Sequence, residues 1–311
     1  MLRIITSRLL QGLLVLFVLG TLTFFLVHAL PYGPFQDEKA IPDHVRERLE
    51  QLHGYDKPLH VQYLLRLKNI VSGDLGASIK VMEGREVSDI LRQAFPVSLT
   101  LGLCAMAIAI SIGIPAGILA AIRRNTSADY QIMGAALLGI CLPSFVIGPL
   151  LAEFLGARLG WFPVSGWNYR DPSSMILPAI TLGLGSAAYL SRLTRAGMLE
   201  ILHQDFIRTA RAKGQKESII ITRHALRGGL IPSLAFLGPA FAGTISGSVV
   251  VESIFQIPGI GRLFIKAIET GDETLIMGPV LLYGTLIVTA NFLVDLIQLW
   301  LNPRLRARAT L

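Results

Sequence analysis

The 311-residue chain has only two cysteines and few charged residues. Cys104 and Cys141 both lie inside apolar runs, so neither a disulfide framework nor a cysteine-based metal site is expected. Charged side chains make up 16% of the chain, whereas soluble domains contain about 25%. Apolar residues reach 52%. This composition excludes an ordinary soluble domain and indicates a membrane protein.

A phosphate-binding loop is also missing, because the dipeptide Gly-Lys occurs nowhere in the sequence. A P-loop needs Gly-Lys followed by Ser or Thr to hold phosphates. His44, His53 and His60 share one segment but do not form the close pairs that a metal site requires. We therefore expect no catalytic residue, no metal and no cofactor in this chain, and no enzyme activity.

Six nearly uncharged windows are long enough to cross a bilayer, because a hydrocarbon core about 30 Å thick needs about 20 helical residues. The windows are residues 9–30, 97–122, 131–152, 174–191, 230–251 and 275–301. The first exceeds the apolar region of a secretory signal, which has about 7–15 residues. Pro143 and Pro149 can kink the third. We expect an all-α polytopic membrane protein with six transmembrane helices in a single domain.

The charges divide unevenly between the two sides of these spans. If the N-terminus is cytoplasmic, the inner segments hold 15 Lys and Arg against four Asp and Glu, whereas the outer segments are net acidic. The positive-inside rule therefore places both termini in the cytoplasm. The formal net charge of +7 is then a topology signal and does not indicate nucleic-acid binding. The outer segments include residues 31–95 and 252–274, and the long inner loop is 192–229.

The outer segment 31–95 and the outer ends of two spans allow two further structural predictions. Val45, Leu49 and Leu52 lie at helical spacing and predict a short helix in the segment 31–95. Glu153 and Glu252 lie at the outer ends of their spans, where we expect them to be exposed.

The inner loop contains a short amphipathic pattern. Phe206 and Ala210 are four residues apart, which predicts one apolar helical face, and Arg208 and Arg211 predict a basic one. Gly214 is expected to end this helix. Two interpretations stay open: the helix docks on a cytoplasmic partner, or the loop is basic only because it follows the topology rule.

Three groups of motifs resemble one known family. The inner loop contains Phe206-Ile207-Arg208-Thr209-Ala210-Arg211-Ala212-Lys213-Gly214 and Arg223-His224-Ala225-Leu226; the fifth span leads through Gly247-Ser248-Val249-Val250-Val251-Glu252 to Pro258-Gly259-Ile260-Gly261; and the outer segment contains Gly73-Asp74-Leu75-Gly76 and Phe95-Pro96-Val97-Ser98. These motifs resemble the B-type permease subunits of the oligopeptide, dipeptide and nickel ABC importers. The resemblance covers nearly the whole chain, although Asn302 stands where an aspartate is usual.

The resemblance implies a type I ABC importer permease in the bacterial inner membrane. Such a subunit pairs with a second, homologous permease to form the translocation path through the lipid bilayer. It receives short peptides from an extracytoplasmic binding protein or lipoprotein. Two ABC ATPase subunits bind ATP and Mg and drive transport. The resemblance assigns ATPase coupling to Asp205, Phe206, Arg208, Thr209, Ala210, Arg211, Lys213 and Gly214.

Four residues inside the spans are candidates for either the translocation path or helix packing. They are Gly238, Gly243 and Gly247 in the fifth span and Asp295 in the sixth. Three alternatives to a peptide importer remain open. The chain could belong to an importer of nickel or another small solute, to a proton-coupled secondary transporter that uses Asp295, or to a membrane anchor without transport activity.

The predicted orientation can be tested with compartment-specific reporters. A reporter fused after Gln215 is expected to read cytoplasmic and one fused after Gly73 to read external, because the basic loop stays inside. Paired fusions to alkaline phosphatase and a fluorescent protein measure this. The opposite reading at either site contradicts the orientation.

Overall fold

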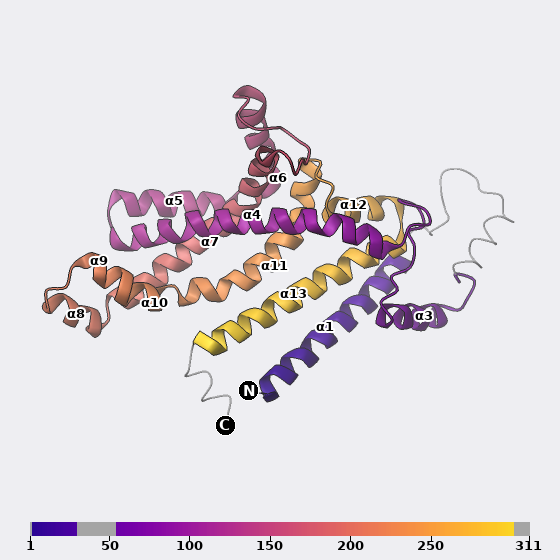
Figure 1. The fold of residues 1–311 in the computed structure, drawn as a ribbon, viewed down its shortest axis with the longest axis horizontal. Helices are drawn as coiled ribbons and strands as arrows, with labels where there is room; N and C mark the ends of the chain where they lie inside the picture. The colour runs from indigo at the N-terminus through magenta and orange to yellow at the C-terminus, as the bar shows by residue number, and fades with distance from the viewer. Residues whose placement is uncertain (1, 30–53, 302–311) are drawn as a thin grey trace. The chain divides into compact units, whose positions relative to one another are not determined.

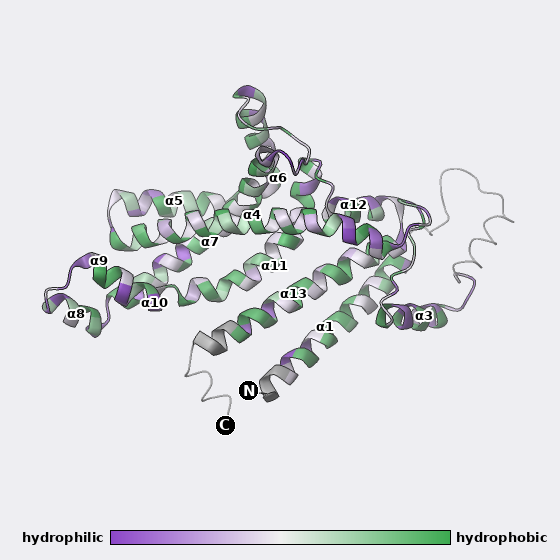
Figure 2. Ribbon diagram, in the orientation of Figure 1, coloured by the Kyte–Doolittle hydropathy of each residue, from purple (hydrophilic) through white to green (hydrophobic). Residues whose placement is uncertain are grey.

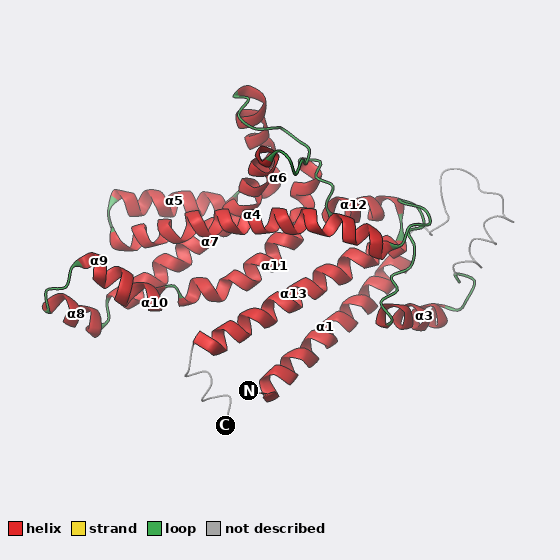
Figure 3. Cartoon of the chain, in the orientation of Figure 1, coloured by secondary structure: helices red, strands yellow, loops and turns green. Residues whose placement is uncertain are grey.

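The computed structural model describes residues 2–29 and 54–301, and within these ranges the chain forms helices and turns without a strand (Figure 3). One isolated bridge joins Ala77 and Glu86. The predicted helix around Leu49 lies outside the described residues, as do His44, His53 and Asn302. The helices are α1 (Leu2–His28), α3 (Leu59–Val71), α4 (Val87–Ile122), α5 (Ser127–Cys141), α6 (Ser144–Leu151), the π-helix η1 (Ala152–Arg158), the 3₁₀-helix η2 (Pro172–Met175), α7 (Ile176–Leu202), α8 (Asp205–Ala212), α9 (Glu217–Ile219), the π-helix η3 (Ile220–Ala225), α10 (Leu226–Gly229), α11 (Ile231–Ile254), α12 (Ile260–Thr270) and α13 (Glu273–Leu301).

Five of the described helices are long and apolar enough to cross a membrane: α1, α4, α7 with η2, α11 and α13. A sixth crossing would combine α5 with α6 and η1. Within the described residues, each apolar window found in the sequence therefore falls mainly on helix. Hydrophobic residues cover these helices, whereas α3 and the α8 to α9 region are more hydrophilic (Figure 2).

The third window is not one straight helix. The chain breaks at Leu142 and Pro143, and the segments before and after the break differ in direction by 105°. Pro143 causes the break because proline lacks an amide hydrogen and disfavours helical geometry in the residue before it. Pro149, by contrast, lies inside α6. The expected kink is therefore located at Pro143.

The fourth span is longer than its apolar window. α7 continues to Leu202, whereas the window ended at residue 191. The extension is stabilised by polar contacts rather than by lipid: Arg195 forms a bidentate pair with Asp129 at 2.7 Å for both contacts, and Thr194 shares a 2.8 Å hydrogen bond with Ser233. The first third of the predicted inner loop is therefore helical.

Two compact units make up the chain, and α4 and α13 contribute to both. The first contains residues 98–257 and the end of α13 from Thr289. Its helices approach closely at small residues. A Cβ added to Gly183 of α7 would lie 2.6 Å from the carbonyl oxygen of Ala105 in α4, and one added to Gly113 of α4 would lie 2.5 Å from that of Ala187. These positions admit only glycine, which lets α4 and α7 pack backbone to backbone.

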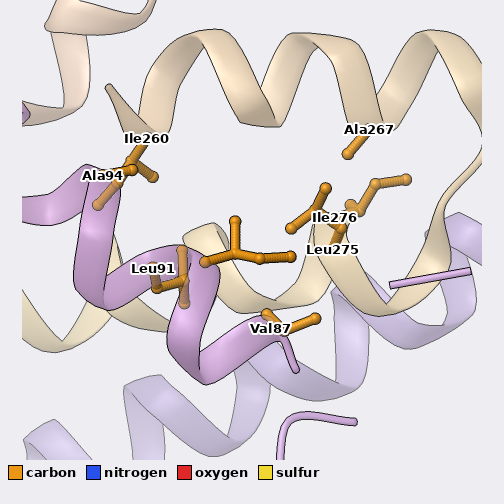
Figure 4. Close-up of a cluster of buried hydrophobic side chains, with 8 residues drawn as sticks. Val87, Leu91, Ala94, Ile260, Ala267, Leu275 and Ile276 are labelled. Atoms are coloured by element: carbon orange, nitrogen blue, oxygen red, sulfur yellow. The ribbon is translucent and has the colours of Figure 1, made fainter. Parts of the chain in front are cut away.

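The second unit contains residues 2–97 and 258–288. α1 and α13 run side by side in it (Figure 1) and touch where Gly284 faces Leu16 and Leu19. A buried apolar cluster joins α4, α12 and α13 (Figure 4). Its members are Val87, Ile90, Leu91, Ala94, Ile260, Ala267, Leu275 and Ile276.

Asp272 connects the turn at residues 78–81, which follows α3, to the start of α13 by hydrogen bonds within this second unit. The carboxylate is fully buried. Burial alone would raise the pKa of Asp272, but hydrogen bonds from Ser78 and from backbone amides outweigh this effect and hold the pKa below its usual value. The donors are Ser78 Oγ at 2.6 Å, the amides of Ile79, Lys80 and Val81 at 3.0 to 3.1 Å, Thr274 Oγ1 at 3.0 Å and the Leu275 amide at 3.1 Å.

The close approach of α4 and α7 predicts that Gly183→Ala destabilises the protein. The new methyl group would overlap the Ala105 carbonyl, and overpacking of this kind costs about 1–3 kcal/mol. The control is Gly134→Ala on α5, where nothing lies within 4 Å of the added Cβ. Thermal unfolding in detergent should show a lower midpoint for Gly183→Ala alone. Equal midpoints for both variants would contradict the packing.

The buried carboxylate predicts an acid-sensitive turn. Because the pKa of Asp272 is lowered on folding, its contribution is complete above the unfolded value of about 3.9 and is lost as the pH falls through the lower folded value. Asp272→Asn should remove about 2 kcal/mol at neutral pH, since hydrogen bonds to a charged group contribute about 1.5–3 kcal/mol. Hydrogen exchange at residues 79–81 measures the effect and should become faster. Unchanged protection in the variant would show that the carboxylate charge does not hold the turn.

Candidate functional site

The inner loop forms the short helix that its sequence predicts. α8 extends from Asp205 to Ala212 and packs through two fully or nearly buried residues, Ile207 and Ala210. They belong to a buried cluster that also contains Ala121 of α4, Met198 of α7, and Ile220 and Ala225 of η3. α8 is thereby attached to two long helices of the first unit.

The apolar residues of α8 that pack against the rest of the chain are Ile207 and Ala210, whereas Phe206 is 47% exposed. Residues three and four apart both lie near one another on a helix, so the spacing from Ala210 alone did not distinguish Ile207 from Phe206. An aromatic side chain is therefore left on the free surface of α8.

The other predicted coupling residues share this exposed surface. Asp205, Arg208, Thr209 and Lys213 are all exposed. Arg208 lies 3.5 Å from Asp205, one turn away. Thr209 Oγ1 donates to the Asp205 carbonyl at 3.0 Å. The surface of α8 thus presents one aromatic ring among polar and cationic groups, which is the composition of a surface that binds protein.

Gly214 terminates α8 with a left-handed backbone conformation at φ +72°. Nothing lies within 4 Å of the position of its missing Cβ. The glycine is therefore required by the backbone angle and not by lack of space.

Arg211 is held inside the loop and does not point freely outward. Its Nη2 donates to Glu217 Oε1 at 2.6 Å and its Nε donates to Glu217 Oε2 at 3.2 Å. The hydrogen bond with Arg211 lowers the pKa of Glu217. This pair joins α8 to α9 across Gly214 and fixes the turn between them. Beside it lies a cavity of about 260 Å³, whose lining includes Arg124, Arg208 and Ile221.

A second candidate region lies inside the membrane part of the first unit. A cavity of about 340 Å³ is lined by α6, α7 and α11 together with the break before α6. Its lining residues are Leu142, Ser144, Ile147, Thr181, Leu182, Gly185, Ser186, Phe236, Pro239, Ala240, Gly243, Thr244 and Gly247.

The three glycines of the fifth span are not equivalent. Gly243 and Gly247 line this cavity and have nothing within 4 Å of an added Cβ, so both are open in this chain. Gly238 instead faces Val294 of α13, whose Cβ would lie 2.9 Å from an added methyl group. Gly238 therefore serves packing, whereas the other two remain candidates for the path.

The acidic residues of the spans differ from the expected pattern in one case. Glu252 was expected to be exposed but is completely buried and accepts hydrogen bonds from Ser98 at 2.7 Å and Ser248 at 2.8 Å. Two serines compensate for the burial of this carboxylate, and serines carry no signal in a hydropathy window. Glu153 is exposed as expected and pairs with Arg158 at 2.9 Å. Asp295 is half-buried on α13.

No motif of the sequence predicts the ionic cluster found in the second unit. Tyr55 donates to Glu273 Oε2 at 2.7 Å, and His28 and Arg66 each lie 3.7 Å from Glu273 Oε1. Burial and the charge of Glu273 raise the pKa of Tyr55 above its usual range. The partners are up to 245 positions apart in the chain, so only folding brings them together. His60, on α3, is exposed.

Comparison with known proteins covers nearly the whole chain. Residues 113–307 match the family described as "Binding-protein-dependent transport system inner membrane component". Residues 1–102 match "Binding-prot-dependent transport system membrane comp, N-term".

Individual relatives agree with this assignment. The chain is 42% identical over 306 residues to the oligopeptide transport system permease protein OppB of Haemophilus influenzae, covering 98% of this chain and all of the relative. It is 41% identical over 289 residues to the dipeptide transport system permease protein DppB of Bacillus subtilis, covering 93% of both.

A solved structure supports the fold alone. The MetNI methionine ABC transporter in inward-facing conformations matches with a TM-score of 0.57 and 16% identity, covering 68% of this chain and 96% of that chain. The all-α importer fold expected from the sequence motifs is thereby confirmed. The chain belongs to the family of binding-protein-dependent transport system inner membrane components.

Proposed function

We propose that this chain is one permease subunit of an ATP-driven importer of short peptides and forms half of its translocation path. The substrate class is supported by relatives named for oligopeptide and dipeptide transport, at 40–42% identity. Its partners are a second, homologous permease, two ABC ATPase subunits and an extracytoplasmic binding protein or lipoprotein. ATP and Mg bind to the ATPases, so ATP hydrolysis takes place outside this chain.

The observation that carries the proposal is the arrangement of α8. One side of this helix is anchored by Ile207 and Ala210 to α4 and α7, and the other presents Phe206 and Arg208. A partner that grips the exposed side therefore pulls on two membrane-crossing helices through a packed interface. Aromatic and arginine side chains are the residues that most often dominate protein interfaces. We assign this grip to the ATPase.

The individual residues of the loop then have separate tasks. Phe206 enters an apolar pocket of the ATPase, and Arg208 and Lys213 meet carbonyl or carboxylate oxygens. Arg211 is the exception, because its pair with Glu217 keeps the loop rigid. A rigid loop transmits closure of the ATPases without absorbing it in local bending.

The substrate route is assigned to the cavity beside α11. Gly243 and Gly247 leave it open. Hydroxyl groups lie in an otherwise apolar wall, and they belong to Ser144, Thr181, Ser186 and Thr244. A peptide has backbone donors and acceptors in every residue, so scattered hydroxyl groups accommodate many sequences. The second permease completes the opposite wall. With both termini in the cytoplasm, α8 lies on the ATPase side, and alternating access follows from rocking of the spans.

Substitution of Gly214 tests the coupling. Gly214→Val is expected to nearly abolish peptide uptake and peptide-stimulated ATP hydrolysis, because a β-branched residue is strained at φ +72°. The matched control is Gly214→Asn, since asparagine tolerates this conformation and the site has room for a side chain. The measurement is uptake and ATP hydrolysis by the complete importer in proteoliposomes. Membrane insertion should be the same for both variants.

Two outcomes would contradict the proposal. Normal stimulated hydrolysis in Gly214→Val would show that the turn does not couple the subunits. Failure of the wild-type importer to take up any peptide would remove the assigned function itself.

A further inference from the structure

The second unit contains a cavity of about 370 Å³ between the start of α4 and α12. Its floor is apolar: Ile90, Ala94 and Val97 of α4 are almost completely buried, and Met82 and Leu263 line its sides. The volume lies within the range of small-molecule sites, about 300–1,000 Å³. The cavity therefore has room for a small ligand with an apolar group.

The mouth of this cavity is cationic. Arg262 and Lys266 lie one turn apart on α12, both exposed, and both line the cavity. None of the described residues that line it is acidic. Arg85, Glu86 and Asp89 lie outside the lining. The described residues of the lining therefore carry two positive charges and no negative one, which favours an anionic group at the mouth.

One further feature favours an anion in the same place. Pro258 and Gly259 also line the cavity, and they immediately precede α12, a helix of 11 residues. The positive end of the helix dipole therefore lies at the cavity.

We propose that this cavity binds the C-terminal residue of a peptide substrate, with its carboxylate at Arg262 and Lys266 and its apolar side chain on the floor. The inference rests on the proposed function, because that function supplies the ligand class. A peptide C-terminus combines the two required parts, an anionic group and a neighbouring side chain, in a single residue. The small volume favours it over the two acyl chains of an anionic lipid.

The site also accounts for the position of the cations. The predicted orientation places the 252–274 segment on the outer side, where a binding protein would deliver the peptide. A shallow site there holds a released peptide close to the path through interactions that do not depend on its sequence. Terminal charges are present on every unmodified peptide, whereas side chains vary.

Binding to the complete importer in phosphatidylcholine nanodiscs, without its binding protein, tests the proposal. The probe is Ala-Ala-Phe labelled at its N-terminus, compared with the same probe as a C-terminal amide and with labelled Ala-Ala-Gly. Lys266→Gln and Arg262→Gln should each weaken binding of Ala-Ala-Phe about tenfold, since each removes a charge-assisted hydrogen bond. The amide should bind wild type about tenfold more weakly and respond little to the substitutions. Ala-Ala-Gly should also bind more weakly, because it leaves the floor empty.

The matched control is Arg92→Gln. Arg92 lies on α4 near the cavity but does not line it, and its side chain is 86% exposed. Loss of binding in this variant would attribute the effect to net charge and overturn the site. Equal binding of acid and amide would also overturn it. Displacement of the probe by phosphatidylglycerol in the nanodiscs would assign the cavity to a lipid head group instead.

Peptide uptake separates this inference from the proposed function. If the wild-type importer takes up Ala-Ala-Phe but Lys266→Gln binds the probe normally, only the C-terminal site is wrong. If the wild-type importer takes up no peptide, the proposed function itself is wrong.

Discussion

Contact between helix backbones at glycine is the constraint on which the membrane part of this protein depends. Lipid tails are as apolar as leucine, so the hydrophobic effect does not drive helices together inside a bilayer. Close packing must supply the stability instead. Gly113 and Gly117 of α4 face α7, and Gly183 of α7 faces α4, so contact is made from both sides of the interface. Larger side chains at these positions would separate the helices and weaken their attraction.

That constraint explains why the inner loop can act as a lever. α8 shares one buried cluster with α4 and α7, and these two helices pack closely on each other at glycine. Arg211 and Glu217 then brace α8 against the next turn. Packed contacts therefore connect the α4–α7 interface to the inner loop without a gap. Phe206 remains exposed on α8, where a partner can bind it.

Features that depend on local sequence could be predicted, and features that depend on distant partners could not. Apolar windows located the spans, and Gly214 located the end of α8, because hydropathy and backbone angle are properties of short segments. The exposure predicted for Glu252 was wrong, because its burial depends on Ser98 of a distant helix. Nothing in the local sequence marks Asp272, because most of its partners lie almost 200 residues away in the chain. Gly238, Gly243 and Gly247 looked alike until their neighbours were known.

The break before α6 has a consequence for water. α5 has 15 residues, which span about 22 Å at 1.5 Å per residue, less than the hydrocarbon thickness of about 30 Å. If α5 begins at the membrane surface, the break falls within the hydrocarbon core, where Pro143 cannot supply an amide hydrogen to the preceding turn. Lipid cannot satisfy the carbonyl groups freed there, so they must face protein or water. Leu142 and Ser144 line the cavity beside α11. Water in that cavity would satisfy carbonyl groups that lipid cannot, and a polar substrate entering it would then meet water rather than lipid.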